Sequence, residues 1–492
     1  MNDHSTVSAN VLLLDGSQPG DRELLGGKAY SVNRMHGLGL PVPLAFALPT
    51  SMCGEYHRNG RALPEPVWQE VREAVTALET DTGRTFGSGP SPLLVSVRSG
   101  AAQSMPGMMD TVLNLGLTRD LVEVLAAESG DEAWARDTWE RFRRSYADIV
   151  LGEAGGEPPT DPWAQLRAAI GAVFDSWTND RVRSYRERHR LGDGGGTAVT
   201  VQAMVFGNRD QTSGTGVLFS RNPNSGEPEL YGEWLTRAQG EDVVSGEATP
   251  IQIADLARDQ PDLYAELCRV AQTLEAEYRD MVDIEFTVES GRLYMLQCRA
   301  GKRAPRAAVR IAVDLAESGR ISATEALDRV TVEHIDALAG ATRVEHHADS
   351  LAQGVGASPG VAHGHVARDF DEVAALTAEG KNAILVTAFT APEDVPTMFA
   401  SAGVLTEVGG ATSHAALVCR EIGLPCVVGA GAGLVERLAG RAITIDGDTG
   451  KVYAEGAVGT TAAVEDRSVS ALIAYAESAG DSAHPVLRLA QT

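Results

Sequence analysis

The run from Gly403 to Gly429 constrains the fold more than any other stretch of this chain. It reads as a strand, a glycine pair, a helix and a second strand, at residues 403–405, 409–410, 414–422 and 426–428. Small polar residues open the expected helix, and Gly423 with Pro425 ends it. A strand–helix–strand unit of this kind is typical of folds that mix sheets and helices, and it places His414 at the start of a helix.

A histidine at this position suits phosphate chemistry. Helix N-termini and glycine-rich loops offer backbone N–H groups to an anion, and the helix dipole favours negative charge there. An imidazole in such a place can attack phosphorus while the amides receive the phosphate oxygens. The structural alternative for so short a motif is a helix cap followed by a buried, hydrogen-bonded histidine.

Composition limits the classes of partner. The 492 residues can form two or three domains, and a net charge of −25 argues against nonspecific binding to nucleic acid or to an anionic membrane. The five cysteines lack metal-ligand spacing and are expected to be core thiols. No signal peptide and no apolar run of membrane-spanning length is evident, so we expect a cytoplasmic protein.

Two segments of the first hundred residues could contact phosphates. Lys28 follows two glycines and precedes a helix, although it lacks the spacing of a P-loop, and a surface lysine is the alternative. Arg98 comes at the end of a buried strand, before a loop of small residues that includes Gly107 and ends near Thr111. Such a loop, rich in backbone donors, is typical of a lid over a triphosphate.

Residues 282–299 predict a hairpin that carries charge on one face. Asp283 and Glu285 share a face of the first strand, and Gln297 and Arg299 share a face of the second. If the two faces meet, their oxygen ligands can hold Mg²⁺ with a nucleotide phosphate. A solvent-facing ladder of salt bridges is the alternative interpretation.

These segments together resemble the pyruvate phosphate dikinase family of phosphoenolpyruvate-utilising enzymes. The resemblance rests on the run around His414, on residues 98–111 and on the hairpin, which occur in the family's order and approximate spacing. It implies an α/β (α+β) fold: an ATP-grasp domain followed by a swivelling β/β/α phosphohistidine domain. The expected ranges are 1–305 for the ATP-grasp domain, 306–348 for a connector of two helices, 349–458 for the phosphohistidine domain and 459–492 for a tail. The ATP-grasp domain is expected to contain a helical insert at about 115–190. Sequence patterns predict helices at 131–152 and 162–189 within this insert.

The resemblance also implies an activity. A phosphotransferase of this family would pass the β-phosphoryl group of ATP to His414 and the γ-phosphoryl group to inorganic phosphate or water, forming AMP. Catalysis would then rest on His414, Arg299, Lys28 and Arg98. The nucleotide would be bound by Lys28, Arg98, Gly107, Thr111, Gln202, Glu285, Gln297 and Arg299, and Mg²⁺ by Glu285, Gln297 and Asp283.

The final acceptor is left open by the sequence. The tail resembles the start of the family's pyruvate-binding barrel, with a strand from Pro485, so we expect a barrel on a separate protein or a small-molecule acceptor. A phosphotransferase acting directly on an antibiotic or metabolite and a phosphocarrier without its own catalysis are the alternatives. Thr387 and Val408 stand where the family often has arginine, which predicts an altered hold on the phosphoryl group.

Overall fold

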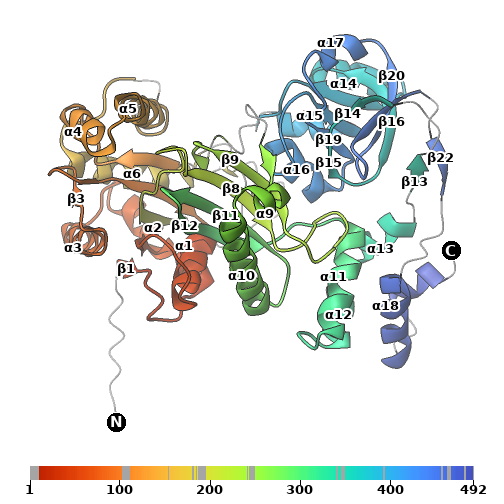
Figure 1. Cartoon of the computed structure of the whole chain (residues 1–492), viewed down its shortest axis with the longest axis horizontal. Coiled ribbons are helices and arrows are strands. Elements are labelled where there is room, and N and C mark those ends of the chain that lie inside the picture. Colours follow the sequence, from red (N-terminus) through yellow and green to blue (C-terminus); the bar gives the residue numbers. More distant parts are fainter. Residues whose placement is uncertain are drawn as a thin grey trace. The chain divides into compact units, whose positions relative to one another are not determined.

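A computed structural model describes residues 10–101, 111–152, 155–179, 182–183, 186, 195–240, 242, 250–339, 342–344, 350–391, 394–455, 458–461, 467–480 and 484–490. Figure 1 shows the helices and strands coloured along the chain, and the chain divides into two compact units. Unit 1 contains Met1–Ser213 and Phe286–Cys298, and unit 2 contains Gly214–Glu285 and Arg299–Thr492. The mixture of sheets and helices confirms the predicted α/β class.

Unit 1 is built on an antiparallel sheet of five strands in the order β1-β2-β7-β5-β6. The strands are β1 (Leu12–Leu13), β2 (Ala45–Leu48), β5 (Val95–Gly100), β6 (Thr111–Leu115) and β7 (Ala198–Ala203). A separate short pair consists of β3 (Thr85–Phe86) and β4 (Pro92–Leu93). β5 lies between β7 and β6, so its backbone is paired on both sides.

Helices cover this sheet and close the core of unit 1. They are α1 (Arg22–Gly37), α2 (Thr50–Arg58), α3 (Glu65–Thr82), α4 (Arg119–Ser129), α5 (Glu132–Tyr146) and α6 (Pro162–Ser176). Helices α1, α2 and α6 pack on β7, and α5 packs on β6. The core contains large aromatic side chains, among them Phe46, Trp68, Phe142 and Phe174.

The predicted helical stretch over residues 162–189 contains a break, after which residues 182, 183 and 186 are again helical. α6 ends at Ser176, and the backbone turns at residues 177–179. After the break, Oδ1 of Asn179 accepts a hydrogen bond of 2.8 Å from the N–H of Val182, which is the contact of an N-cap residue at the start of a new turn. Helix α5 agrees better with its prediction and continues as the π-helical segment Ala147–Leu151.

The predicted hairpin is present as β11 (Val282–Glu289) and β12 (Arg292–Ala300). Its turn is formed by Ser290 and Gly291, both with positive φ, which is the backbone of a tight two-residue hairpin turn. Both strands belong to a sheet in the order β10-β9-β8-β11-β12. Its other strands are β8 (Gly214–Phe219), β9 (Tyr231–Thr236) and β10 (Ile251–Gln252), and the short α9 (Leu256–Asp259) and longer α10 (Pro261–Tyr278) precede the hairpin.

The connector has three helices, so the prediction of two is wrong. They are α11 (Pro305–Glu317), α12 (Ala323–Asp328) and α13 (Val332–Ala339). Gly319, with φ of 72°, follows the end of α11. Ser322 then starts α12, because its Oγ accepts from the N–H of Glu325, and this short second helix does not show as an apolar period in the sequence.

An eight-stranded mixed sheet forms the C-terminal part of unit 2. The order is β14-β21-β20-β16-β17-β18-β19-β15. The pairs β16–β17, β17–β18 and β18–β19 run parallel. The strands are β14 (Ser350–Gln353), β15 (Val355–Ser358), β16 (Val361–Ala367), β17 (Ala383–Thr387), β18 (Gly403–Thr406), β19 (Cys426–Val428), β20 (Ala442–Asp446) and β21 (Lys451–Ala454). Helices α14 (Phe370–Ala378), α15 (Val395–Ala400), α16 (His414–Ile422) and α17 (Leu434–Leu438) accompany it.

Each face of this sheet has its own core. Leu405 and Val427 belong to one apolar cluster, and Val404 and Cys426 belong to another. Successive residues of a strand point to opposite faces, which explains why the strands around α16 are continuously apolar. The pattern strand, glycine pair, helix and strand predicted from the sequence is confirmed at β18, α16 and β19.

The last described elements are β13 (Thr342–Val344) paired with β22 (Val458–Thr461), and α18 (Arg467–Ser478). The predicted strand from Pro485 is wrong, because Pro485–Ala490 is a 3₁₀ helix. Its first turn is closed by the N–H of Leu487, which donates to the carbonyl oxygen of His484. None of the described helices combines the length and apolar character needed to cross a membrane.

Candidate active site

In unit 1 a glycine pair brings Lys28 against the end of β5. Gly26 interrupts α1 with φ of 70°, and a Cβ on it would lie 2.0 Å from the carbonyl oxygen of Gly100. The N–H of Gly27 donates to the carbonyl oxygen of Ala101 at 2.9 Å. Only glycine permits this close approach at position 26, and the backbone of Gly27 adds a hydrogen bond, so the start of α1 is docked on the end of β5.

Arg98 lies on β5 within the same part of unit 1. It faces Thr111 in the register of β5 and β6. Its Nη2 donates to Oε1 of Gln297 on β12 at 3.3 Å. β12 is in turn tied to α1, because the N–H of Cys298 donates to Oγ of Ser31 at 2.8 Å. Arg98, Thr111 and Gln297 are therefore neighbours on β5, β6 and β12, and Lys28 follows the glycine that docks α1 on the end of β5.

Gln202 and Gly107 were also predicted to contact the nucleotide. Gln202 is buried on β7, where its Nε2 donates to the carbonyl oxygen of Pro43 at 3.0 Å. That bond anchors the side chain within the sheet of unit 1. Gly107 lies outside the described residues, as does the rest of the expected lid from residue 102 to residue 110.

In unit 2 the hairpin pairs Asp283 with Arg299. The Nε of Arg299 lies 2.8 Å from Oδ2 of Asp283, whose side chain is 3% exposed. Burial raises the pKa of Asp283, and the guanidinium of Arg299 opposes this shift. The carboxylate of Asp283 is buried while the side chain of Arg299 remains 30% exposed, unlike a ladder in which both partners face solvent, and Asp283 holds the orientation of Arg299.

The hairpin carboxylates fit a magnesium ion that shares its shell with a nucleotide. No group of three or more His, Cys, Asp or Glu residues forms a metal cage among the described residues. Mg²⁺ is usually held by one or two carboxylates plus phosphates and water, so no cage is needed. Oδ1 of Asp283 is buried without a hydrogen-bond partner, and Glu285 lies two residues along the same strand. These oxygen donors are the kind that Mg²⁺ prefers.

His414 is the first residue of α16, directly after the N-cap residue Ser413. Because β17 and β18 are parallel, the loops that follow them meet at one edge of the sheet. Thr390 comes from the loop after β17, and its Oγ1 lies 3.1 Å from Nδ1 of His414. Thr390 is buried, so the hydroxyl has little freedom and the ring orientation is defined.

A carboxylate already occupies the amide groups beside this histidine. Glu233 on β9 accepts from the N–H of Ala411 at 2.5 Å and from both the N–H and Oγ1 of Thr412, at 3.0 and 2.6 Å. A Cβ on Gly410 would lie 2.0 Å from Oε1 of Glu233, so glycine is needed for the contact. The N–H groups of Ala411 and Thr412, which the sequence predicts to be donors to phosphate oxygens, are therefore taken by the chain's own carboxylate in this structure.

Sequence reasoning missed Thr390 and Glu233. Nothing in the spacing of Thr390 connects it with a histidine 24 positions later. Glu233 had one available signal, because a carboxylate between Gly232 and Trp234 in an otherwise apolar strand requires a buried partner.

Two models of known protein families match this chain. The family model "Pyruvate phosphate dikinase, AMP/ATP-binding domain" matches residues 59–263 and 256–319, and the model "PEP-utilising enzyme, mobile domain" matches residues 379–450. The chain thus combines a nucleotide-binding domain with the mobile domain of the phosphoenolpyruvate-utilising class. The second model contains His414, and the first contains Arg98 and the hairpin.

Individual relatives define the family more narrowly. The chain is 44% identical over 501 residues to pyruvate, phosphate dikinase of Rhizobium meliloti (strain 1021), covering 88% of this chain and 56% of that protein. It is 40% identical over 515 residues to pyruvate, phosphate dikinase of Clostridium symbiosum, covering 93% and 59%. The chain belongs to the pyruvate phosphate dikinase family, and it spans about half the length of these relatives.

Proposed function

We propose that this chain transfers a phosphoryl group from ATP to its own His414 and then to an acceptor. The observation that supports this most is the geometry around His414, which is the first residue of α16 and whose ring is held by Thr390. The matching AMP/ATP-binding domain supplies the reason for choosing ATP as the donor.

The transfer to histidine is a displacement at the β-phosphorus of ATP. With Nδ1 held by Thr390, attack is assigned to Nε2 of His414. A bond forms between Nε2 and the β-phosphorus as the bond from that phosphorus to the oxygen of the α-phosphate breaks, so AMP leaves. The γ-phosphoryl group passes to inorganic phosphate or to water, giving pyrophosphate or phosphate.

Residues of the two units have separate roles in this proposal. Lys28 and Arg98 neutralise phosphate charge from unit 1, and Arg299, oriented by Asp283, does so from unit 2. Gln297 and Glu285 are proposed to hold Mg²⁺, with the second oxygen of Asp283 as a further donor. A bound Mg²⁺ would withdraw charge from the phosphate oxygens and so favour the displacement.

The acceptor is the least defined part of the proposal. The relatives' names mention pyruvate, which makes pyruvate the first acceptor to examine. Thr387 and Val408 flank the site where the family often has arginine; the hydroxyl of Thr387 donates to the carbonyl oxygen of Phe389 instead of offering a cation. An acceptor that needs fewer cations around the phosphoryl group is therefore the alternative.

Intact mass spectrometry tests the proposal. After incubation with ATP, Mg²⁺ and phosphate, the chain should gain the mass of one phosphoryl group, and an equal amount of AMP should form. His414→Ala should gain none, whereas His365→Ala, which alters another histidine of the same sheet, should behave as the wild type. A gain of mass by His414→Ala would refute the assignment of the nucleophile.

A further inference from the structure

A cavity in unit 2 is lined mainly by cations, and the phosphoryl-transfer residues do not account for it. It has a volume of about 330 Å³ and is lined by Asp280, Gly301, Lys302, Arg303, Ala308, Ile311, Ala312, Leu315, Arg329, His334 and Arg420. Four of these side chains are cationic and one is a carboxylate. The cavity therefore has a surplus of positive charge in a confined space.

Arg420, on the last turn of α16, is the least compensated of these charges. Its side chain is 6% exposed, and none of its three guanidinium nitrogens has a hydrogen-bond partner among the described residues. It contacts the ring of Phe219, 5.5 Å from the ring centroid, which stabilises the charge only in part. Burial lowers the pKa of Arg420, but a guanidinium stays protonated at neutral pH.

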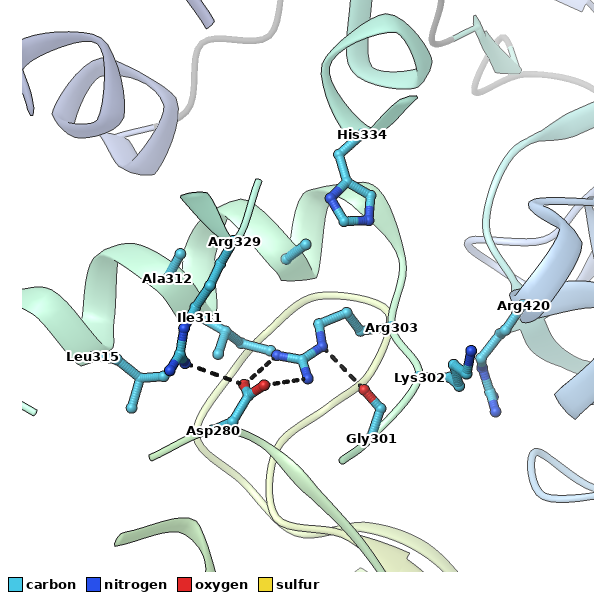
Figure 2. Close-up of a pocket in the computed structure, with 11 residues that line it drawn as sticks. Asp280, Gly301, Lys302, Arg303, Ile311, Ala312, Leu315, Arg329, His334 and Arg420 are labelled. Carbon is cyan, nitrogen blue, oxygen red and sulfur yellow. Dashed lines mark hydrogen bonds and ion pairs between the residues drawn. The ribbon is translucent and has the colours of Figure 1, made fainter. Parts of the chain in front are cut away.

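Burying a guanidinium without a hydrogen-bond partner costs free energy, and a bound anion would offset that cost. Figure 2 shows Arg420 beside Lys302 on one side of the cavity, while Arg303 and Arg329 gather around Asp280. Asp280 accepts from Nη2 of Arg303 at 3.0 Å and lies 3.8 Å from Nη1 of Arg329. The single carboxylate is thus engaged by these two arginines and does not pair with Arg420.

The opposite wall is apolar. Ile311, Ala312 and Leu315 of α11 line it, and Figure 2 shows α11 running along the cavity. Sites for small organic ligands have volumes of about 300–1,000 Å³ and combine apolar walls with a few polar groups. This cavity is at the small end of that range, which favours a ligand of few carbon atoms.

We propose that the cavity is a binding site for a small phosphorylated metabolite, with the phosphate group against Arg420 and Lys302 and the carbon portion against α11. Guanidinium and ammonium groups together are the donors that recognise phosphate. Arg420 lies on the last turn of α16, whereas His414 is its first residue. Binding in the cavity needs neither ATP nor the phosphohistidine. It therefore stands independently of the proposed activity.

Calorimetric titration of the intact chain with 3-phosphoglycerate tests this site. The wild type should bind, and Arg420→Met and Lys302→Gln should each weaken binding about ten- to a hundredfold, the effect of losing a charge-assisted hydrogen bond. Arg467→Gln, which changes an exposed arginine of α18 that pairs with Glu317, should bind as the wild type. Arg98→Gln should also retain this binding, which separates the site from the proposed ATP site.

Thermal unfolding supplies a second measurement, which does not depend on activity. Without ligand, Arg420→Met should unfold at the wild-type temperature or above it, because it removes a buried unpaired charge. 3-Phosphoglycerate should raise the unfolding temperature of the wild type but not of this variant. Inorganic phosphate that binds as tightly, with the same dependence on Arg420 and Lys302, would support the site with phosphate as its ligand.

Two results would overturn the proposal. The first is wild-type protein that binds neither 3-phosphoglycerate nor inorganic phosphate at millimolar concentrations. The second is binding that Arg420→Met and Lys302→Gln both leave unchanged, because the anion would then lie elsewhere. Folded Lys302→Gln protein keeps the test decisive if Arg420→Met fails to fold.

Discussion

At the scale of single residues, we propose that the hydrogen bond between Thr390 and Nδ1 of His414 leaves Nε2 as the reacting nitrogen. Thr390→Val keeps the shape of the side chain but removes the hydroxyl, so the ring loses its orientation. We expect phosphorylation of His414 to slow about five- to tenfold, the effect of losing about 1 kcal/mol of hydrogen bonding. The rate of AMP formation in a single turnover measures this.

A matched control is available on α15. Thr397 is another buried threonine of the same sheet region, and Thr397→Val should leave the rate within about twofold of the wild type. Equal rates for both variants would show that Thr390 does not position His414.

Glu233 leads to a prediction about stability. Its buried carboxylate satisfies two backbone N–H groups and one hydroxyl, and Glu233→Ala would leave these donors unpaired. We expect a loss of about 2 kcal/mol or more in the free energy of unfolding measured in urea. Glu227→Ala, which removes an exposed pair with Arg310, should cost less than about 1 kcal/mol. Similar losses in both variants would contradict the account of Glu233.

The candidate site residues that the sequence proposed are those that carry their own chemical signal. His414 combines a nucleophile with a helix start, and Lys28 and Arg98 follow glycines or strands that orient them. Thr390 and Glu233 have no such signal, because their importance comes from partners that are remote in the sequence. Arg420 also lacks a signal in the sequence, because only the fold shows that its guanidinium is buried without a hydrogen-bond partner among the described residues.

At the scale of elements, the β11–β12 hairpin combines a buried anchor with charged groups for phosphate. Arg299→Met should slow phosphorylation of His414 about 100-fold or more, since a preorganised charge is lost. Asp283→Asn should have a smaller effect in the same direction, because it loosens Arg299 without removing it. Labelling time courses of both variants measure these effects.

Arg292→Gln provides the control on the same strand. Arg292 lies at the exposed start of β12, over the ring of Tyr294, and its loss should not affect the labelling rate. Near-normal rates for Arg299→Met and Asp283→Asn as well would mean that the hairpin has only a structural role.

Helix α1 should confer a pH dependence on stability. Burial lowers the pKa of His36 below its ordinary value of 6.5. The unfolded chain therefore takes up a proton at a higher pH than the folded chain, and stability is lost as the pH falls through 6.5. His36→Gln should make the decline in unfolding temperature between about pH 7 and pH 5 shallower than in the wild type. Parallel curves for the two proteins would contradict this.

Helices whose ends are marked by small polar residues, glycine or proline were predicted well, and helices with weaker end signals were not. α16 was predicted to the residue, because small polar residues open it and Gly423 and Pro425 close it. The region after α6 and the connector were predicted less well. In both places a single polar side chain, Asn179 or Ser322, starts a new turn within a sequence that still has helical composition.

At the scale of the whole molecule, the proposed roles are shared between the two compact units. Unit 1 contributes Lys28, Arg98 and Gln297, and unit 2 contributes Arg299 and His414. Phosphoryl transfer should therefore require the intact chain, and the phosphohistidine should accumulate when no acceptor is supplied. The family relation and the α/β class followed from the sequence, whereas the acceptor does not follow from the fold.

The position of label transferred from ATP tests the central claim most directly. The chain is incubated in parallel with ATP labelled at the β- or the γ-phosphorus, together with Mg²⁺ and phosphate, and His414 is then analysed for acid-labile label. We predict label from β-labelled ATP only, at no more than one phosphoryl group per chain, and none in His414→Ala. Label from γ-labelled ATP on His414, or β-label retained by His414→Ala, would contradict the account.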